Sequence, residues 1–471
     1  MTLFKYGTTA IQGPILIKRL LELRRPLQAY KLAQSVTVVA QDLELHKVLT
    51  DILFLQSLAA YELRCYRKAS ELLGRLRVVA KTANISPPKE IADRIWTANK
   101  AVDVRLRELQ HGDYDWLSIF HKSMTQASDR RYLMEAADFI GPVKLKLAPG
   151  KGRGLFLTRD VRAGELLIVE KAIGVGFEGE NASDYRNSYG FLFPRTEMPG
   201  ISSAIGMVVA QLITGVLDNP SLHHQLIQLS GGQKSDFLPS LKLPPSENAW
   251  LESKVPASGQ LDLEQIKAII GTNSYTLPLV LKDVTTNPSL DYEEAGGLFY
   301  ASSFMNHSCI PNASRISFGD IMVIRANTDL KKGAEITQSY MGRAPHHLRA
   351  TRLKDLWGID CTCTLCQTDR MQGHKQLSQR EKLIRDMGWV LGPIASLWGP
   401  PSLLLSKFLP KRWGHIPASP LVFAVKRLVR MMEDTFPSSE DRLPKDLHLS
   451  TAYYMLSVFT RFQDHRLSIE V

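Results

Sequence analysis

The sequence predicts an α+β protein in which a β-rich middle is flanked by helical regions. Three observations lead to this prediction. The region up to Glu135 carries small and apolar side chains at helical spacing, the region from 143 to 340 contains short alternating strands and glycine turns, and the pattern is helical again beyond Met371. With 471 residues the chain is too long for one compact core, so two or three domains are expected.

The N-terminal region is expected to form helical hairpins. Ser57, Ala60 and Ala69 recur at helical spacing on either side of a short break at Arg64–Tyr66. Small residues at these positions allow two helices to pack closely, and the pattern is typical of a tetratricopeptide-type hairpin. Generic antiparallel helices fit nearly as well, so both interpretations stay open at this point.

The middle of the chain has the character of strands joined by tight turns. Val143–Leu147 alternates as a strand does, and Pro149–Gly154 is a glycine turn. A long insert follows at 176–270, with helical pieces expected at Ile205–Leu217 and Leu222–Leu229. Strand and turn character then returns from Gly271 to Tyr340. Further short strands are expected at 155–157, 165–170, 321–325 and 335–339.

Charge and hydropathy narrow the class of protein. The net charge is +11, and the basic excess lies in the two flanks. A basic surface can attract nucleic acid, but no run of four basic residues occurs, so solubility is the favoured reading and direct nucleic-acid binding stays open. The longest apolar stretch, Ile205–Leu217, is interrupted by Gln211 and falls short of the roughly 20 residues that a spanning helix needs, so no membrane partner is expected.

The five cysteines are unevenly placed. Cys361, Cys363 and Cys366 form a CxCxxC cluster, Cys309 lies upstream, and Cys65 lies in the helical region. Zn²⁺ takes four ligands in a tetrahedron, and three clustered thiolates plus Cys309 complete such a set. An odd cysteine count in a chain with no signal-peptide pattern favours a reducing compartment, so the cytoplasm, the nucleus or both are expected.

Several motifs occur together in a fixed order. They are GKGRGLFLTRDVRAGELLIVEK, GTNSYTL, GLFYASSFMNHSCIPNA, GAEITQSY and WGIDCTCTLC, over about 143–175 and 271–366. In these motifs and their order the sequence resembles the SET-domain protein lysine methyltransferases. It looks like a fungal-type subgroup with tetratricopeptide-like helices, and it is similar to the SET-and-MYND enzymes. Residues 176–270 contain no cysteine, so the zinc finger of the latter is absent.

The resemblance implies a domain organisation. A tetratricopeptide-like helical domain is expected at 1–140, and a SET domain at 141–345, split by the insert. A zinc-binding post-SET segment is expected at 346–370 and a helical region at 371–471. The family threads its C-terminal segment under a loop, which forms a pseudoknot. Cys309, Cys361, Cys363 and Cys366 would then hold a structural Zn²⁺.

The resemblance also implies an activity, the transfer of a methyl group from S-adenosylmethionine to a lysine amine by in-line displacement. Tyr340 would be the active-site tyrosine, orienting the amine first and acting as a base second. The cofactor-binding residues implied are Lys151, Gly152, Arg153, Gly154, Asn273, Asn306, His307, Trp357 and Ile359. Ile359 stands where relatives often have Phe, and Trp357 could instead line the channel.

The implied partners follow from this activity. The substrate would be a lysine of a histone or of a non-histone protein, and the helical N-terminal region would bind a peptide partner. The alternative is a tetratricopeptide-type binding scaffold with a catalytically inactive SET core. Such a core would be expected to lose Tyr340, Asn306 or the glycines, and the sequence retains all of them.

Overall fold

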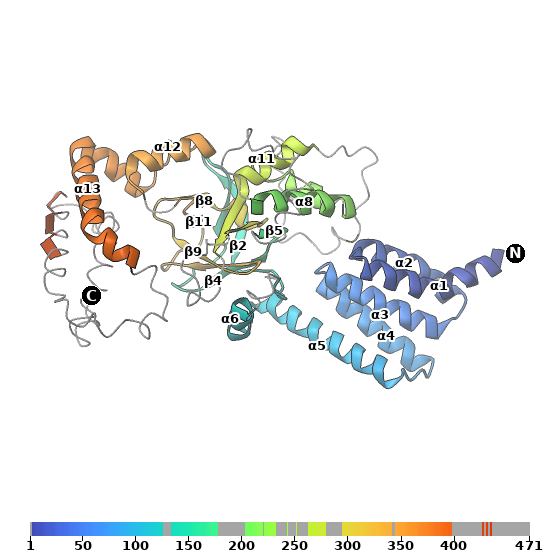
Figure 1. Ribbon diagram of the computed structural model, residues 1–471. Helices are drawn as coiled ribbons and strands as arrows, with labels where there is room; N and C mark the ends of the chain where they lie inside the picture. The colour runs from blue at the N-terminus through green and yellow to red at the C-terminus, as the bar shows by residue number, and fades with distance from the viewer. Residues whose placement is uncertain are drawn as a thin grey trace, which may run out of the picture. The chain divides into compact units, whose positions relative to one another are not determined.

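We describe the protein from a computed structural model. The structure describes residues 2–125, 133–177, 203–219, 221–231, 243, 251, 262–278, 294–341 and 344–397, with 426, 427, 430, 431, 434 and 435. These residues confirm the α+β class, with helices first, β-sheets in the middle and helices again towards the C-terminus (Figure 1). Among the described helices, none combines the length and the apolar character needed to cross a lipid bilayer.

The chain divides into two compact units. The first contains Met1–Asn306 and Pro311–Gln338, and the second contains His307–Ile310 together with Ser339–Val471. The short turn around Cys309 is therefore grouped with a segment that begins only after the last strands of the chain. Threading of one unit by the other, as in the expected pseudoknot, stays a prediction.

The first unit begins with a run of consecutive helices. They are α1 (Thr2–Glu22), α2 (Pro26–Asp42), α3 (His46–Glu62), α4 (Tyr66–Thr82), α5 (Lys89–His111) and α6 (Trp116–Thr125). Between successive helices from α1 to α5, one residue takes a left-handed conformation with positive φ, and these are Arg24, Glu44, Arg64 and Asn84. At each turn the next backbone N–H reaches back over the helix end, for example from Leu45 to the Ala40 carbonyl, which is a Schellman closure.

These turns give the helices a regular period. Helix α2 begins at Pro26 and α4 begins at Tyr66, so one pair of helices with its turns spans 40 residues. This interval is longer than the roughly 34 residues of a tetratricopeptide repeat and closer to the period of other helical repeats, so the tetratricopeptide likeness stays a prediction. Small buried residues let the helices approach each other closely, among them Ala29, Ala33, Ala59, Ala60 and Ala69.

Three β-sheets follow the helices in the part of the chain that the structure describes. The strands pair antiparallel throughout the first and third sheets, and β2, β3 and β11 do so in the second. The first has the order β1-β4-β10-β9, the second β2-β3-β11-β8 and the third β5-β7-β6. In chain order the strands are β1 (Phe139–Ile140), β2 (Val143–Ala148), β3 (Gly152–Leu157), β4 (Leu166–Lys171), β5 (Gly174–Phe177), β6 (Ser274–Pro278), β7 (Glu294–Leu298), β8 (Asn306–His307), β9 (Ala313–Phe318), β10 (Ile321–Ala326) and β11 (Glu335–Gln338). The strands expected from the sequence at 143–147, 155–157, 165–170, 321–325 and 335–339 all fall on this set.

Helices of the insert complete the core of the first unit. They are α8 (Ser203–Asp218), α9 (Ser221–Leu226) and α11 (Leu263–Asn273). Helix α8, drawn in green in Figure 1, lies against β5, where Gly174 faces Leu212 and Val208. The remainder of the insert, 178–202 and most of 232–261, lies outside the described residues.

The second unit contains the helices that follow the sheets. They are α12 (His346–Trp357) and α13 (Thr364–Leu397), and α13 is interrupted at Gly373, which has a φ of 77°. The expected zinc-binding segment, 346–370, therefore consists of α12, an extended turn and the first residues of α13. Of the expected C-terminal helical region, the part beyond Leu397 lies outside the described residues except at six positions. The predicted domain boundaries stay predictions.

Candidate functional site

The four expected metal ligands lie together in the second unit. The sulfur atoms of Cys309, Cys361, Cys363 and Cys366 are all within 4.8 Å of one another. Cys309 comes from the turn after β8, Cys361 and Cys363 come from the segment that leads into α13, and Cys366 lies in the first turn of α13. The Sγ atom of Cys309 lies 3.5 Å from that of Cys366 and 4.0 Å from that of Cys361.

The chemistry of this cluster suits Zn²⁺. A tetrahedral site with Zn–S bonds of about 2.3 Å places its sulfurs roughly 3.8 Å apart, close to the spacing of the two pairs above. Hydrogen bonds among the four sulfurs lower the pKa of the Cys361 and Cys363 thiols and raise the pKa of the Cys309 and Cys366 thiols. The Arg370 guanidinium donates to the Cys361 carbonyl at 2.9 Å and brings positive charge near a cluster that is anionic when it holds a metal. The cluster therefore fits a structural zinc.

His307 connects this cluster to Tyr340. Its Nδ1 atom accepts a hydrogen bond from the Tyr340 backbone N–H at 3.0 Å, and its Nε2 atom lies 3.2 Å from the Cys309 sulfur. An accepting Nδ1 in a neutral ring leaves the proton on Nε2, directed at the sulfur. Because both ring nitrogens are used and the residue is only 6% exposed, a contact of His307 with a cofactor would come from its backbone.

Aromatic rings surround Tyr340. The Tyr340 ring centroid lies 5.3 Å from that of His307 and 5.2 Å from that of Trp357. Trp357 is the last residue of α12, and Gly358 ends that helix in the left-handed conformation with a φ of 66°. This cap returns the Ile359 N–H to the Leu353 carbonyl, so Trp357 and Ile359 join Tyr340 in one apolar cluster. The second unit thus places a phenol beside apolar walls.

A second group of candidate residues lies in the first unit, around Asn306. The Asn306 side-chain Nδ2 donates to the Arg153 carbonyl at 3.0 Å and to the Glu335 carboxylate at 2.7 Å. The other oxygen of Glu335 lies 3.1 Å from the Lys151 ammonium. This arrangement brings the predicted residues Lys151, Arg153 and Asn306 together with Glu335, which the sequence analysis did not single out.

The two motif glycines have different physical roles. Gly152 has a φ of 75°, where a side chain is strained, and no atom lies within 4 Å of the position that its Cβ would take. A Cβ on Gly154 would lie 2.7 Å from the Glu335 Oε1 atom and 2.9 Å from the Asn306 Nδ2 atom. Gly154 is therefore needed to leave room for the Asn306–Glu335 hydrogen bond.

Two predicted cofactor ligands are engaged elsewhere. The Arg153 guanidinium bonds to Gln228 and lies 5.1 Å from the Phe304 ring centroid, and burial lowers its pKa. The sequence pattern predicts strand and turn character at Asn273, whereas in the structure this residue ends α11. There the Asn273 Nδ2 atom donates to the Ser230 and Ile269 carbonyls, each at 2.7 Å. Only the backbone of Arg153 faces Asn306.

Glu170 is a second acidic residue that sequence reasoning missed. From β4, its carboxylate accepts from the Ala301 N–H at 2.6 Å and from the Ser302 N–H and hydroxyl at 2.9 Å. Burial, followed by the nearby Asp138, raises the pKa of Glu170 to about 7. In the sequence, the feature that could have drawn attention to Glu170 is its position as the one acidic residue in the otherwise apolar segment LLIVE, which is expected to be a strand. Glu170 holds the turn that leads to Asn306.

Comparisons with known proteins agree with these motifs. Residues 152–341 match the model of the SET domain family. A Gibberella zeae protein named as a methyltransferase is 26% identical over 372 residues, covering 77% of this chain and 47% of that protein. Mouse histone-lysine N-methyltransferase SMYD3 is 30% identical over 132 residues, 26% of this chain and 28% of that enzyme.

Human protein-lysine N-methyltransferase SMYD4 is 36% identical over 81 residues, 16% of this chain and 10% of that enzyme. The chain spans about half the length of the Gibberella zeae protein and less of the other two. A solved structure of Rubisco LSMT bound to AdoMet aligns over 75% of this chain and 93% of its own, with 11% identity and a TM-score of 0.25.

Proposed function

We propose that this chain, whose residues 152–341 form a SET domain, is an S-adenosylmethionine-dependent protein-lysine N-methyltransferase. The observation that carries the proposal is the match of these residues to the SET domain family. The match contains Gly152, Gly154, Asn306 and Tyr340, so the residues that the chemistry needs are present in this chain.

The residues around Asn306 fit the proposed cofactor. S-adenosylmethionine carries an ammonium group, which needs hydrogen-bond acceptors. Asn306 uses its NH₂ group on protein acceptors, so its amide oxygen is the atom left to accept. In this proposal Gly152 and Gly154 shape the backbone, and Arg153 and His307 contribute through their main chain. Asn273 keeps a structural role, since its NH₂ group is used within the fold.

The cofactor, when bound, supplies a methyl group on a positively charged sulfur. The protein must bring a neutral lysine amine to it, although a free lysine has a pKa near 10.4 and only about one in a thousand is neutral near pH 7.4. Apolar surroundings lower that pKa, and Trp357 and Ile359 supply such surroundings beside Tyr340. The Tyr340 hydroxyl would orient the amine, so alignment and exclusion of water are the main tasks of the protein.

Zinc has a structural role in this proposal. It would join the turn around Cys309 to the segment that carries the other three cysteines, and His307 lies against that turn. Metal ligation would thereby hold His307 and, through its hydrogen bond, the backbone of Tyr340. Such ligation requires reduced thiols, in line with our proposal that the protein works in the cytoplasm or the nucleus.

Tyr340→Phe tests the catalytic role. The variant is expected to bind S-adenosylmethionine in isothermal titration as the parent does, yet to lose transfer of labelled methyl groups into proteins of a whole-cell lysate. Tyr30→Phe, in α2 and away from the lining of the helical cavity described below, removes the same hydroxyl elsewhere and is the matched control. Equal transfer by Tyr340→Phe would exclude the role of Tyr340. Binding of the cofactor by the parent with no transfer to any protein would favour the scaffold with an inactive SET core.

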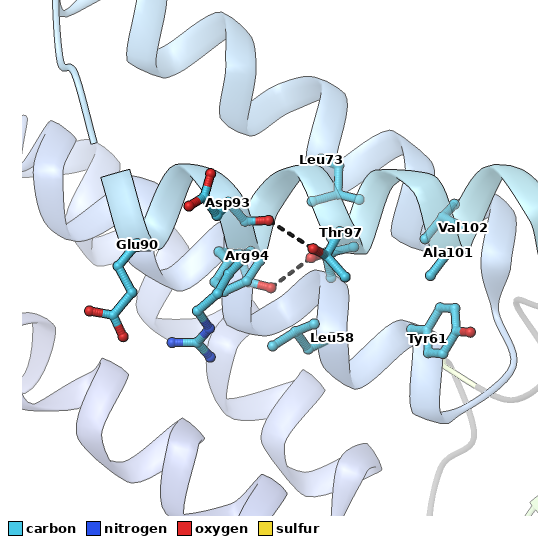
Figure 2. Close-up of a pocket in the computed structure, with 12 residues that line it drawn as sticks. Leu58, Tyr61, Leu73, Glu90, Asp93, Arg94, Thr97, Ala101 and Val102 are labelled. Carbon is cyan, nitrogen blue, oxygen red and sulfur yellow. Dashed lines mark hydrogen bonds between the residues drawn. The ribbon is translucent and has the colours of Figure 1, made fainter. Parts of the chain in front are cut away.

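The proposed substrate is a lysine of a histone or of a non-histone protein, and the helical region offers a place for a peptide of that substrate. A cavity of about 480 Å³ lies between α3 and α5 (Figure 2). Leu58 and Tyr61 line it from α3, and Ala98 and Ala101 line it from α5. Its polar end carries Glu90, Asp93 and Arg94 at the start of α5, and the Arg94 guanidinium lies 5.4 Å from the Phe54 ring centroid.

We propose that this cavity takes a segment of the protein substrate with a large apolar side chain next to a basic one. The two carboxylates at the rim form no ion pair within the part of the chain that the structure describes, whereas the guanidinium is directed at an aromatic ring. Ala98→Trp would fill the cavity and is expected to raise KM for protein substrates without changing kcat. Val78→Trp, on the exposed face of α4, is the control. An unchanged KM in Ala98→Trp would exclude this docking role.

A further inference from the structure

We infer that Glu335 is a positioning residue that holds the Asn306 amide with its oxygen presented to the ammonium group of S-adenosylmethionine. The inference rests on the proposed function, because it concerns the same cofactor. Glu335 itself would not touch the cofactor. Its carboxylate determines which end of the neighbouring amide is available to a ligand.

The hydrogen bonds around Asn306 determine the orientation of its amide. An asparagine NH₂ group has two hydrogens, and both have an acceptor here, the Arg153 carbonyl at 3.0 Å and the Glu335 Oε1 atom at 2.7 Å. Neither acceptor can donate, so a flipped amide would place its oxygen against two other oxygens. The chain therefore presents the amide oxygen, which suits a cation.

Glu335 is itself firmly placed. It begins β11 and pairs with Phe156 of β3, and its carbonyl accepts from the Asn312 side chain at 2.8 Å. Its second carboxylate oxygen lies 3.1 Å from the Lys151 ammonium, and its side chain is 19% exposed. Lys151 thus balances the charge of a carboxylate that is largely withdrawn from water.

Gly154 gives independent support from the packing. A methyl group at this position would lie 2.7 Å from the same Glu335 oxygen that Asn306 contacts. The second glycine of the KGRG motif therefore makes room for the glutamate. The motif and Glu335 are far apart in the sequence, and they act on one amide.

Equilibrium binding by titration calorimetry tests the inference with two probes. They are S-adenosylmethionine and methylthioadenosine, which keeps the nucleoside and a thioether but lacks the amino-acid end. Glu335→Ala is expected to weaken S-adenosylmethionine binding by about tenfold or more, since a hydrogen bond to a charged group is lost from the pair that orients the amide. Its affinity for methylthioadenosine is expected to stay within about twofold of the parent.

Two further variants separate positioning from other roles. Glu335→Gln keeps an oxygen that can accept from Asn306, so it is expected to recover most of the affinity. A direct contact between the carboxylate and the cofactor would instead leave Glu335→Gln as weak as Glu335→Ala, which would overturn the inference. Asp160→Ala removes an exposed carboxylate of the same unit, whose partner is Lys331, and is the matched control.

The other possible results of these titrations distinguish a failure of the inference from a failure of the proposed function. Parent-like binding of S-adenosylmethionine by Glu335→Ala would overturn the inference and leave the proposed function standing. Equal loss of both probes, or loss of bound zinc with them, would also overturn it, since a general structural role predicts that result. No binding of S-adenosylmethionine by the parent protein would reject the proposed function itself.

Discussion

We predict that a buried ion pair in the second unit holds the expected zinc-binding segment, 346–370, in place. Arg349 of α12 pairs with Asp369 of α13, and their side chains are 7% and 0% exposed. The Arg349 guanidinium also donates to the Ala344 carbonyl. Another ion pair formed by α12, between Lys354 and Asp360, is largely exposed, at 58% and 78%. The two cations lie on one helix but in opposite environments.

Removing each cation in the same way isolates the effect of burial. Arg349→Leu leaves the Asp369 carboxylate buried without its guanidinium, which is expected to cost about 3–5 kcal/mol. Lys354→Leu breaks the exposed pair, which is worth about 0–1 kcal/mol. Leucine, arginine and lysine have similar helix propensities, so the helix itself contributes little to the difference.

The assay is thermal unfolding, together with the rate at which a chelator removes zinc. At about 2–4 °C per kcal/mol for a domain of this order of size, Arg349→Leu is expected to melt roughly 6–20 °C below the parent and to release zinc faster. The double variant Arg349→Leu with Asp369→Leu removes both charges of this pair, so neither is left buried alone, and it is expected to recover most of the loss. Melting of Arg349→Leu within about 2 °C of Lys354→Leu would refute the reasoning.

Three more predictions follow from buried groups. Because burial raises the pKa of Glu170 from its ordinary 4.5 to about 7, its contribution to stability is full below pH 4.5 and is lost as the pH rises through 7. Urea unfolding should therefore show the parent losing about 2–3 kcal/mol more than Glu170→Gln between pH 5 and pH 8; parallel pH profiles would contradict this. Zinc analysis should find about one zinc per chain in the parent and in Cys65→Ser, whose thiol is buried among the helices, and none in Cys363→Ser; retained zinc in the latter would exclude the four-thiolate site. Leu53→Ala, at a fully buried position of α3, should cost about 2–5 kcal/mol in the same unfolding assay, against about 0.5 kcal/mol or less for Val78→Ala on the surface; equal costs would place α3 outside the core.

Local patterns were enough for much of the fold. Glycine turns and period-two alternation predicted the strands around 143–170 and 321–339, because a residue's preference for a turn or a pleated strand acts over a few neighbours. The helical hairpins were predicted for the same reason. Their long period was not, since it depends on left-handed turns at Arg24, Glu44 and Arg64, where no glycine marks the helix end.

The metal site was predictable because its ligands are rare. Three cysteines in one short segment and one upstream are a chemically complete set, and the structure brings all four sulfurs within 4.8 Å. The hydrogen-bonding partners of His307 were not predictable. An imidazole has two nitrogens, and only the folded chain decided that one accepts from Tyr340 and the other faces Cys309.

The sequence by itself determined the element types, the thiolate set and the order of the motifs, because each of these is carried by residues close together or by a scarce residue type. Only the tertiary structure decided that Glu335 orients Asn306, that Glu170 holds the turn before it and that the Arg153 side chain is directed elsewhere. A carboxylate is common in any sequence, and its role depends on which donors the fold brings within about 3 Å. That information lies in pairings between strands that are far apart along the chain, which no local pattern records.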